Sequence, residues 1–255
     1  MIDAALLAGR RIMRGFGGAR THDAKADGSP VTECDREAEE LIADRLRPVF
    51  AGLPIVAEEA VSTGHVPPEL GRRFLLVDPL DGTREFVAGL PDFTVNIAVV
   101  EEGAPVAGVV FAPAFGELFF TAGRGAFKEI VEAEGARRDA HPIAARIAPE
   151  RLIAVVSRSH YDSDADAFLG THAIDAVVPV GSSLKFCRIA EGAADLYPKL
   201  GRTMEWDTAA GHAVLQAAGG AVLRRDGSPL AYGKRGLAGE ADFANPHFYA
   251  RGRES

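Results

Sequence analysis

The 255-residue sequence has little cysteine, with only Cys34 and Cys187. Two cysteines cannot build the disulfide framework of a small secreted domain or a cysteine-rich zinc site. We therefore expect the reducing environment of the cytoplasm. The sequence also lacks any run of about 20 uninterrupted apolar residues, which excludes a predicted membrane-spanning helix.

The N-terminal segment, residues 1–16, has an apolar helical face but no signal-peptide core. Ile2, Ala5, Leu6, Ile12 and Met13 fall on roughly one side of a helix, while charged residues interrupt the segment too early for secretion. We expect an amphipathic helix here.

Positive charge is also scarce. The 28 Lys and Arg residues are outnumbered by 36 Asp and Glu residues, which gives a formal net charge of −8. No basic run offsets this balance, which argues against a nucleic-acid polymer as partner. An acidic protein that binds an anionic small molecule needs cations between itself and that ligand.

The length and the 47% hydrophobic content predict one compact unit of two lobes. We predict an N-terminal α+β lobe over residues 1–145 and a C-terminal α/β lobe over residues 146–255, with Glu129–His141 as the boundary segment. The sequence shows no internal repeat and no low-complexity tract.

The first lobe is predicted to begin with two helices around a Gly- and Asp-rich loop. The second helix starts near Thr32 and carries an apolar stripe of Ala38, Leu41, Ile42, Leu46 and Val49. Short buried strands are expected at 53–59 and 74–77, followed by an antiparallel meander of three strands at 93–100, 104–112 and 116–122.

Strands alternate with helices in the second lobe, which predicts sheets sandwiched by helices. We expect strands at 152–157, 174–180, 194–198 and 221–225. Helices are expected at 164–169, 182–192 and 206–220, the last of them stopped by glycines.

The stretch "FLLVDPLDGTREF", from Phe74 to Phe86, ends an apolar run in two carboxylates, a glycine and a hydroxyl. Taken alone, it is well explained as a turn with a helix cap. The alternative is that Asp78 and Asp81 lie at the carboxyl end of a strand, where layered α/β folds bind ligands. The amides of Gly82 and Thr83 would then face an anion such as phosphate.

Three more acidic positions follow the same pattern, and each has an ordinary explanation. Glu58 and Glu59 end the run "PIVAEE" and could form a solvated loop. Asp207 in "EWDTAAGHAV" could be a helix N-cap with Trp206 as a hydrophobic staple. Asp35 lies three residues after Thr32, as in a capping box.

Together these positions predict one cluster of carboxylates. Two carboxylates about 4 Å apart repel each other by roughly 4 kcal/mol at an effective dielectric constant of 20, so a cluster needs protons or metal ions. The candidate ligands are all oxygen donors, without a set of Cys or His residues, which favours Mg²⁺. Bound Mg²⁺ would also draw a phosphate to an acidic protein.

These residues resemble the lithium-sensitive, Mg²⁺-dependent phosphatase superfamily of inositol monophosphatases, fructose-1,6-bisphosphatases and 3'(2'),5'-bisphosphate nucleotidases. The resemblance rests on "DPLDGT" after an apolar strand, "EE" upstream, and "WD" and "AGG" downstream. It extends over nearly the whole chain and is strongest for the bacterial 3'(2'),5'-bisphosphate nucleotidase branch, the CysQ type, through "KADGSPVTECD", "FTVNIAVV", "SRSH", "GSSLKFC", "AEGAADLYPKLG" and "NPHF".

The resemblance implies an α/β fold, a layered α/β/α/β/α sandwich. It also implies two Mg²⁺ ions per chain, with room for a third near Glu58, and inhibition by Li⁺. The implied metal ligands are Glu58, Asp78, the carbonyl of Leu80, Asp81 and Asp207, and the implied catalytic residues are Glu58 and the pair Asp35 and Thr83, which polarises the attacking water.

The implied phosphate cradle is Gly82 and Thr83, flanked by the same Leu80, Asp81 and Asp207. Further substrate contacts are expected at Gly181, Ser182, Ser183 and Lys185. Met204 and Glu205, before Trp206, are more acidic than the resemblance leads us to expect, which leaves the fine shape of the substrate pocket open.

The implied reaction is hydrolysis of adenosine 3',5'-bisphosphate to AMP and phosphate, which clears a by-product of sulfate assimilation. Lys199 in "YPKLG" stands where inositol monophosphatases usually carry an acidic residue, and a cation there suits a second phosphate. It is equally well explained as a solvated surface lysine.

Two alternatives stay open. One is an inositol- or sugar-phosphate phosphatase of the same superfamily, and the other is a non-catalytic protein that binds Mg²⁺ or nucleotides. The resemblance also allows a homodimer and a peripheral association with the cytoplasmic face of the inner membrane.

Overall fold

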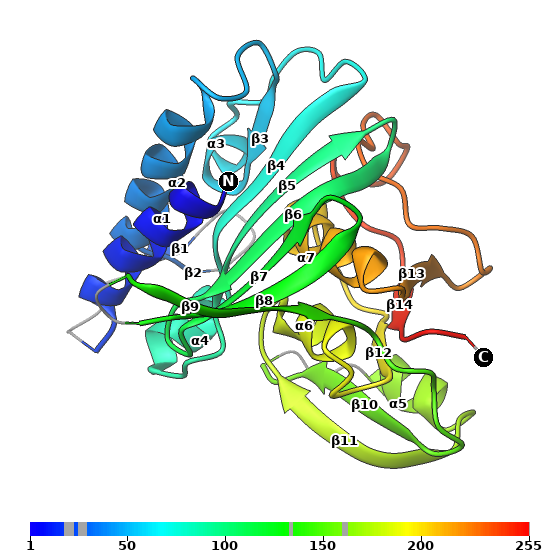
Figure 1. Ribbon diagram of the computed structural model, residues 1–255. Helices are drawn as coiled ribbons and strands as arrows, with labels where there is room; N and C mark the ends of the chain where they lie inside the picture. The colour runs from blue at the N-terminus through cyan, green and yellow to red at the C-terminus, as the bar shows by residue number, and fades with distance from the viewer. Residues whose placement is uncertain (18–22, 25–29, 133–134, 160–162, 255) are drawn as a thin grey trace.

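A computed structural model describes residues 1–17, 23–24, 30–132, 135–159 and 163–254 (Figure 1). The chain begins with helix α1 (Ile2–Gly15), the short strands β1 (Asp23–Ala24) and β2 (Pro30–Val31), and helix α2 (Glu33–Leu46). The predicted pair of helices around a loop is therefore confirmed, and most of that loop lies outside the described residues.

Helices α1 and α2 pack together through apolar faces. Ala5 and Ile12 of α1 are fully buried, as are Ala38 and Ile42 of α2. Val49 is an exception to the predicted stripe, because α2 ends at Leu46 and the Val49 side chain is 70% exposed.

The larger sheet has seven strands in the order β3-β4-β5-β6-β7-β8-β9. Strand β3 is parallel to β4 and every other pair is antiparallel. The strands are β3 (Ile55–Ala57), β4 (Arg73–Asp81), β5 (Thr94–Glu101), β6 (Ala104–Ala112), β7 (Glu117–Ala122), β8 (Gly125–Val131) and β9 (Arg137–Ile143).

The meander predicted from residue 93 to residue 122 is confirmed as β5, β6 and β7. The segment Glu129–His141, predicted as the lobe boundary, instead contains the end of β8 and most of β9. The larger sheet ends at Ile143 and the next strand begins at Leu152. The division into lobes at residue 145 stays a prediction.

The smaller sheet has five strands in the order β11-β10-β12-β14-β13. Its strands are β10 (Leu152–Ser157), β11 (Ile174–Val180), β12 (Leu196–Lys199), β13 (Ala221–Arg224) and β14 (Phe248–Arg251). Strands β10, β11 and β12 run parallel, while β14 runs antiparallel to its neighbours on both sides. The strands predicted at 152–157 and 174–180 are confirmed residue for residue.

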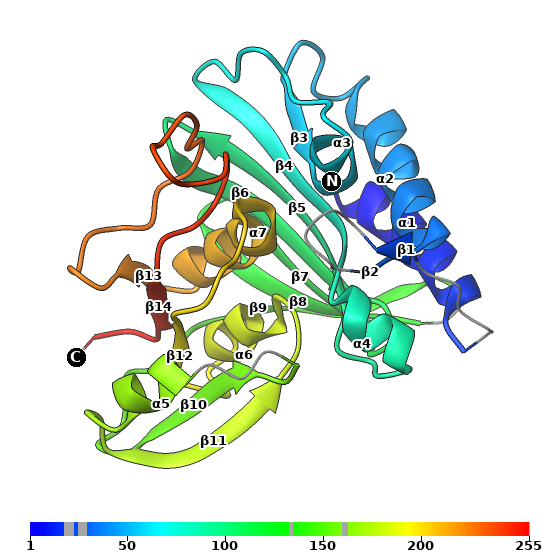
Figure 2. The same cartoon turned by 180° about the vertical axis from the view of Figure 1, so that it is seen from behind.

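Five helices complete the described chain: α3 (Glu58–Ser62), α4 (Thr83–Ala88), α5 (Ser163–Leu169), α6 (Leu184–Ala190) and α7 (Glu205–Ala217). Helices α1 and α2 cover one face of the larger sheet, and α6 and α7 lie between the two sheets (Figures 1 and 2). Helix α5 packs on the far side of the smaller sheet. The predicted α/β/α/β/α sandwich is thereby confirmed.

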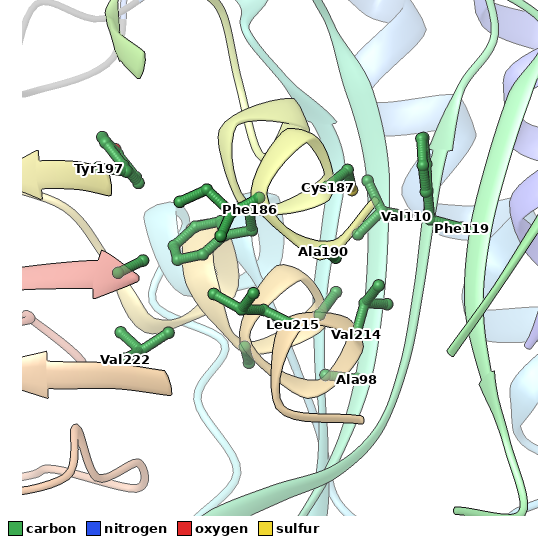
Figure 3. Packing of buried hydrophobic residues seen from close by; sticks show 14 of the residues in the cluster. Ala98, Val110, Phe119, Phe186, Cys187, Ala190, Tyr197, Val214, Leu215 and Val222 are labelled. Carbon is green, nitrogen blue, oxygen red and sulfur yellow. The ribbon is translucent and has the colours of Figure 1, made fainter. Parts of the chain in front are cut away.

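The largest apolar cluster fills the space between the sheets, where α6 and α7 meet strands of both (Figure 3). Phe186 on α6 lies between Tyr197 on β12 and Leu215 on α7. Glycines allow close approach in this layer. A methyl group on Gly108 of β6 would lie 2.4 Å from the carbonyl oxygen of Ala210 on α7.

No helix among the described residues is long and apolar enough to cross a membrane.

The contact of Gly108 with α7 leads to a stability prediction. Gly108→Ala should lower the free energy of unfolding by about 1–3 kcal/mol, because its methyl group would overlap both the Ala210 carbonyl and the Ala213 side chain. Gly170→Ala is the matched control, since its methyl group would make only ordinary contacts of 3.4 and 3.5 Å. Urea unfolding of both variants checks this. Equal stability of the two variants would contradict it.

Candidate active site

Strand β4 delivers the first two carboxylates, through an irregularity. The strand continues past the predicted end to Asp81, and its register against β5 shifts between Asp78 and Asp81. Pro79 has no N–H to donate to the sheet, and the amide of Leu80 donates instead to Asp78 Oδ1 at 3.1 Å. The bulge therefore turns both acidic side chains toward one side.

Glu58 follows β3, which pairs with β4 so that Ala57 lies opposite Val77. This register brings Glu58 level with Asp78. Glu58 is the first residue of α3 rather than part of a solvated loop. Helix α3 is held by Glu39 of α2, whose carboxylate accepts the backbone N–H groups of Glu59 and Ala60 at 2.7 and 2.8 Å.

Asp207 reaches the same place from α7, which packs against the larger sheet. It is the third residue of the helix, not the N-cap that the sequence suggested, because the helix begins at Glu205. Its Oδ2 accepts the backbone N–H of Met204 at 2.8 Å. This bond fixes Asp207 in the first turn.

The four carboxylates are close enough to oppose one another's ionisation. Burial raises the pKa of Asp78 well above its usual range, and the charges of Glu58, Asp81 and Asp207 raise it further. Burial also raises the pKa of Asp207, again with contributions from Asp81 and Glu58. The predicted cluster is therefore present and calls for a compensating cation.

The donors fit a hard, oxygen-loving metal ion, since they are carboxylates and one carbonyl. No group of three or more His, Cys, Asp or Glu side chains in the described part of the chain is arranged so that it could hold a metal ion by itself. Mg²⁺ keeps several water ligands, so the carboxylates and the Leu80 carbonyl would supply only part of its coordination shell.

Asp35 has two separate tasks. Its Oδ2 accepts the N–H and hydroxyl of Thr32 at 2.7 and 2.6 Å, so the predicted capping box is present. Its Oδ1 accepts the hydroxyl of Thr83 at 3.1 Å, and that hydroxyl also lies 3.1 Å from the Leu80 carbonyl oxygen. The helix cap and the predicted Asp35–Thr83 pair therefore coexist on one buried side chain.

Gly82 precedes α4 in the left-handed conformation, with φ of 94°. A methyl group there would lie 2.9 Å from the carbonyl oxygen of Asp92, so the position requires glycine for both conformation and space. This conformation starts α4 at Thr83 and brings the Thr83 hydroxyl beside Asp35.

The turn 181–183 links β11 to α6 and contacts Asp81 rather than standing apart. Asp81 Oδ2 accepts the Ser182 hydroxyl at 2.8 Å and the Ser183 N–H at 2.7 Å. Gly181 and Ser182 line the cleft described below, but Ser183 does not, and its side chain is buried. Direct substrate contact by these residues stays a prediction.

The two predicted lysines differ in their surroundings. Lys185 Nζ donates to the carbonyl oxygens of Ser182 at 2.6 Å and Val180 at 3.3 Å, and burial lowers its pKa to about 8. Lys199 ends β12 and lines the cleft while being only 7% exposed, so it is not the solvated surface lysine that the sequence allowed.

One cleft of about 810 Å³ brings the predicted residues together. Glu58, Asp78, Leu80, Asp81, Gly82, Thr83, Lys185, Lys199 and Asp207 all line it. Asp35 and Ser183 do not line it, but they contact Thr83 and Asp81, which do.

Three arginines in the cleft wall were missed by the sequence analysis: Arg84, Arg158 and Arg202. Arg158 follows strand β10 directly, and its guanidinium donates to Asp92 Oδ1 at 3.2 Å and to the Pro179 carbonyl at 3.0 Å. The rule that polar residues gather after strand ends, applied to "LIAVVSR", would have found Arg158.

Glu205, the acidic residue that the family resemblance did not lead us to expect near the substrate pocket, faces away from the cleft. It is fully buried, and its carboxylate accepts the N–H groups of Gly233 and Lys234 at 2.6 and 2.9 Å. The Lys234 ammonium lies 2.7 Å from the same carboxylate. Glu205 therefore anchors the segment behind α7.

Several similar proteins that align with most of this chain carry the same name. A 3'(2'),5'-bisphosphate nucleotidase CysQ of Escherichia coli O157:H7 is 42% identical over 245 residues, covering 94% of both chains. The CysQ protein of Buchnera aphidicola is 38% identical over 226 residues, covering 89% of this chain and 82% of its own.

Solved structures agree with these sequences. The crystal structure of CysQ from Bacteroides thetaiotaomicron has a TM-score of 0.79 at 36% identity and covers 100% of this chain and 96% of its own. An IMPase from Thermotoga maritima has a TM-score of 0.76 at 28% identity, covering 98% and 89%. The inositol monophosphatase family matches residues 1–253. The chain belongs to the inositol monophosphatase family.

Proposed function

We propose that this chain is a Mg²⁺-dependent phosphatase that hydrolyses the 3'-phosphate of adenosine 3',5'-bisphosphate to AMP and phosphate. The observation that carries the proposal is the meeting of four carboxylates with five basic side chains in one cleft. Relatives about 40% identical over most of their length are named as nucleotidases for this substrate class. Their reaction is a phosphoric monoester hydrolysis.

The carboxylates would hold the metal ions. Glu58, Asp78 and the Leu80 carbonyl would hold one Mg²⁺, and Asp78, Asp81 and Asp207 a second. A third would have its place near Glu58. Bound Mg²⁺ supplies a more acidic water and neutralises charge on the phosphoryl group and the leaving oxygen.

Thr83 and Asp35 would orient the attacking water. Asp35 Oδ1 accepts a hydrogen bond from the Thr83 hydroxyl. A lone pair of Thr83 Oγ1 is then left to accept a hydrogen bond from that water. The opposite oxygen of Asp35 is fixed by Thr32, so Asp35 cannot rotate away. This role for the pair rests on their geometry and on the family resemblance.

The basic side chains favour a bisphosphate over a polyol. The second phosphate lies on the far side of the ribose and cannot reach the same metal ions. The Lys185 ammonium already donates to two carbonyl groups of the 180–182 segment. Lys199, a largely buried lysine that lines the cleft, is our first choice as its partner, with Arg158 and Arg202 of the same wall as alternatives.

Other expectations from the resemblance stay predictions. They are the number of Mg²⁺ ions, inhibition by Li⁺, a cytoplasmic location, a homodimer and a peripheral membrane association.

A phosphate-release panel tests the proposed function. With Mg²⁺, adenosine 3',5'-bisphosphate should release phosphate with a kcat/KM at least about tenfold above that for inositol 1-phosphate or fructose 1,6-bisphosphate, and chelation with EDTA should abolish release. A preference for inositol 1-phosphate would favour the polyol-phosphatase alternative. No release from any substrate would support a non-catalytic binding protein.

Asp78→Asn should abolish turnover without unfolding the protein. It removes a buried charge that three neighbouring carboxylates oppose, so the metal-free thermal midpoint should hold or rise. Turnover should fall by more than about 10³-fold, because Asp78 would contact both ions. Asp175→Asn, at an exposed carboxylate paired with Arg151, is the matched control. Full turnover of Asp78→Asn at saturating Mg²⁺ would refute the assignment.

Lys199→Gln should lower kcat/KM for adenosine 3',5'-bisphosphate about 5- to 150-fold, the range for a lost charge-assisted contact. Turnover of 4-nitrophenyl phosphate, which has no second phosphate, should change less than about twofold. Equal losses on both substrates would mean that Lys199 supports the metal site or the fold. Unchanged kinetics on both would assign the second phosphate to Arg158 or Arg202.

A further inference from the structure

The turn 181–183 has a strained but firmly held shape. Ser182 adopts φ of +55°, in the left-handed region that residues other than glycine rarely occupy. The Gly181 N–H donates to Asp92 Oδ1 at 3.1 Å, and the Ser182 carbonyl accepts Lys185 Nζ at 2.6 Å. Strain of this kind persists only where the surroundings over-determine it, and it gathers at functional sites.

One carboxylate oxygen of Asp81 has its hydrogen-bonding capacity filled, mainly by this turn. Asp81 Oδ2 accepts the Ser182 hydroxyl, the Ser183 N–H and, at a longer 3.4 Å, the Asn96 side-chain amide. A carboxylate oxygen offers about two lone pairs, so Oδ2 has no capacity left. The geometry leaves Oδ1 as the oxygen that Asp81 can offer to a ligand in the cleft.

Strand β5 supports this arrangement from behind. Its register places Thr94 opposite Asp81 and Asn96 opposite Asp78. Both side chains are buried. The Thr94 hydroxyl contacts the Ser182 hydroxyl and donates to Asn96 Oδ1 at 3.0 Å. The Asn96 amide donates to the Ser183 hydroxyl at 2.9 Å.

The same chain of hydrogen bonds ends on α7. The Ser183 hydroxyl donates to the backbone carbonyl of Asp207 at 2.6 Å. Asp81 and Asp207 come from different elements, yet both are tied to Ser183, one through its N–H and the other through its hydroxyl.

We propose that Thr94, Asn96, Ser182 and Ser183 form a positioning network that aims Asp81 into the cleft and sets its separation from Asp207 for cation binding. The proposal rests on the proposed function for the identity of the cation. Ser183 and the hydroxyl of Ser182 act through the Asp81 carboxylate and the Asp207 backbone, because their hydrogen-bonding groups are already engaged there.

Mg²⁺ titration of the full chain by calorimetry, without substrate, tests the proposal. Ser183→Ala and Asn96→Leu should each weaken Mg²⁺ binding about tenfold. Thr121→Val is the matched control, since it removes a hydroxyl that accepts the Gly108 N–H at 3.0 Å in the same sheet. It should lower the thermal midpoint to a similar extent and leave Mg²⁺ affinity within about twofold.

A double-mutant cycle separates positioning from general support. In an Asp81→Asn background, Asn96→Leu should change Mg²⁺ affinity less than about twofold, because the carboxylate that the network positions relative to Asp207 is no longer there. Additive effects of the two substitutions on Mg²⁺ affinity would overturn the proposal. It would also be overturned if Ser183→Ala and Asn96→Leu kept the Mg²⁺ affinity of Thr121→Val, or if the parent chain bound no Mg²⁺. Failure of the proposed function is distinct: the parent would bind Mg²⁺, with the network effects intact, and release no phosphate from the bisphosphate.

Discussion

Repulsion between neighbouring carboxylates is the constraint on which the structure around the cleft depends. Four acidic side chains meet in one cleft, and burial removes water that would screen the charges of Asp78 and Asp207. Left to themselves, such groups would move apart or take up protons. Three of them are instead restrained by a backbone or side-chain donor: Leu80 N–H for Asp78, Met204 N–H for Asp207, and the 181–183 turn for Asp81. The protein holds the charges in place before a cation arrives, which is the preorganisation that phosphoryl transfer needs.

The five-layer sandwich explains how the restraints are built. Asp78 and Asp81 come from the larger sheet and Asp207 from the helical layer between the sheets, while Lys199 comes from the smaller sheet. Helix α7 touches strands of both sheets, and the close contact at Gly108 fixes its distance from β6. The cleft therefore depends on the interior packing of the whole chain, and the apolar cluster around Phe186 is part of what keeps the charges aligned (Figure 3).

The sequence predicted the acidic residues of the cleft better than the residues that hold them in place. Asp78 and Glu58 could be found because each ends an apolar run, and Asp207 because it opens a helix pattern. Asn96 gave no such signal, since inside "FTVNIAVV" it looks like an ordinary polar residue of a strand, and its role comes from the register that sets it opposite Asp78. Strands β8 and β9 were missed for a related reason. Strand β9 is an exposed, charged edge that is defined by its pairing with β8, and from the sequence its residues were assigned to the boundary between the lobes.

The two contacts of Asp35 link the stability of helix α2 to the proposed catalytic pair. One oxygen caps α2 and the other accepts the Thr83 hydroxyl, so we expect replacement of Asp35 to weaken the fold as well as the proposed chemistry. Asp78 also accepts the Leu80 N–H, a hydrogen bond that an asparagine could keep, and its charge opposes folding of the metal-free chain. In a lineage freed from selection for activity, drift would therefore tend to remove Asp78 early and retain Asp35. An aspartate at position 35 in a distant homologue is thus weak evidence that the homologue is still an enzyme, whereas an aspartate at position 78 is strong evidence.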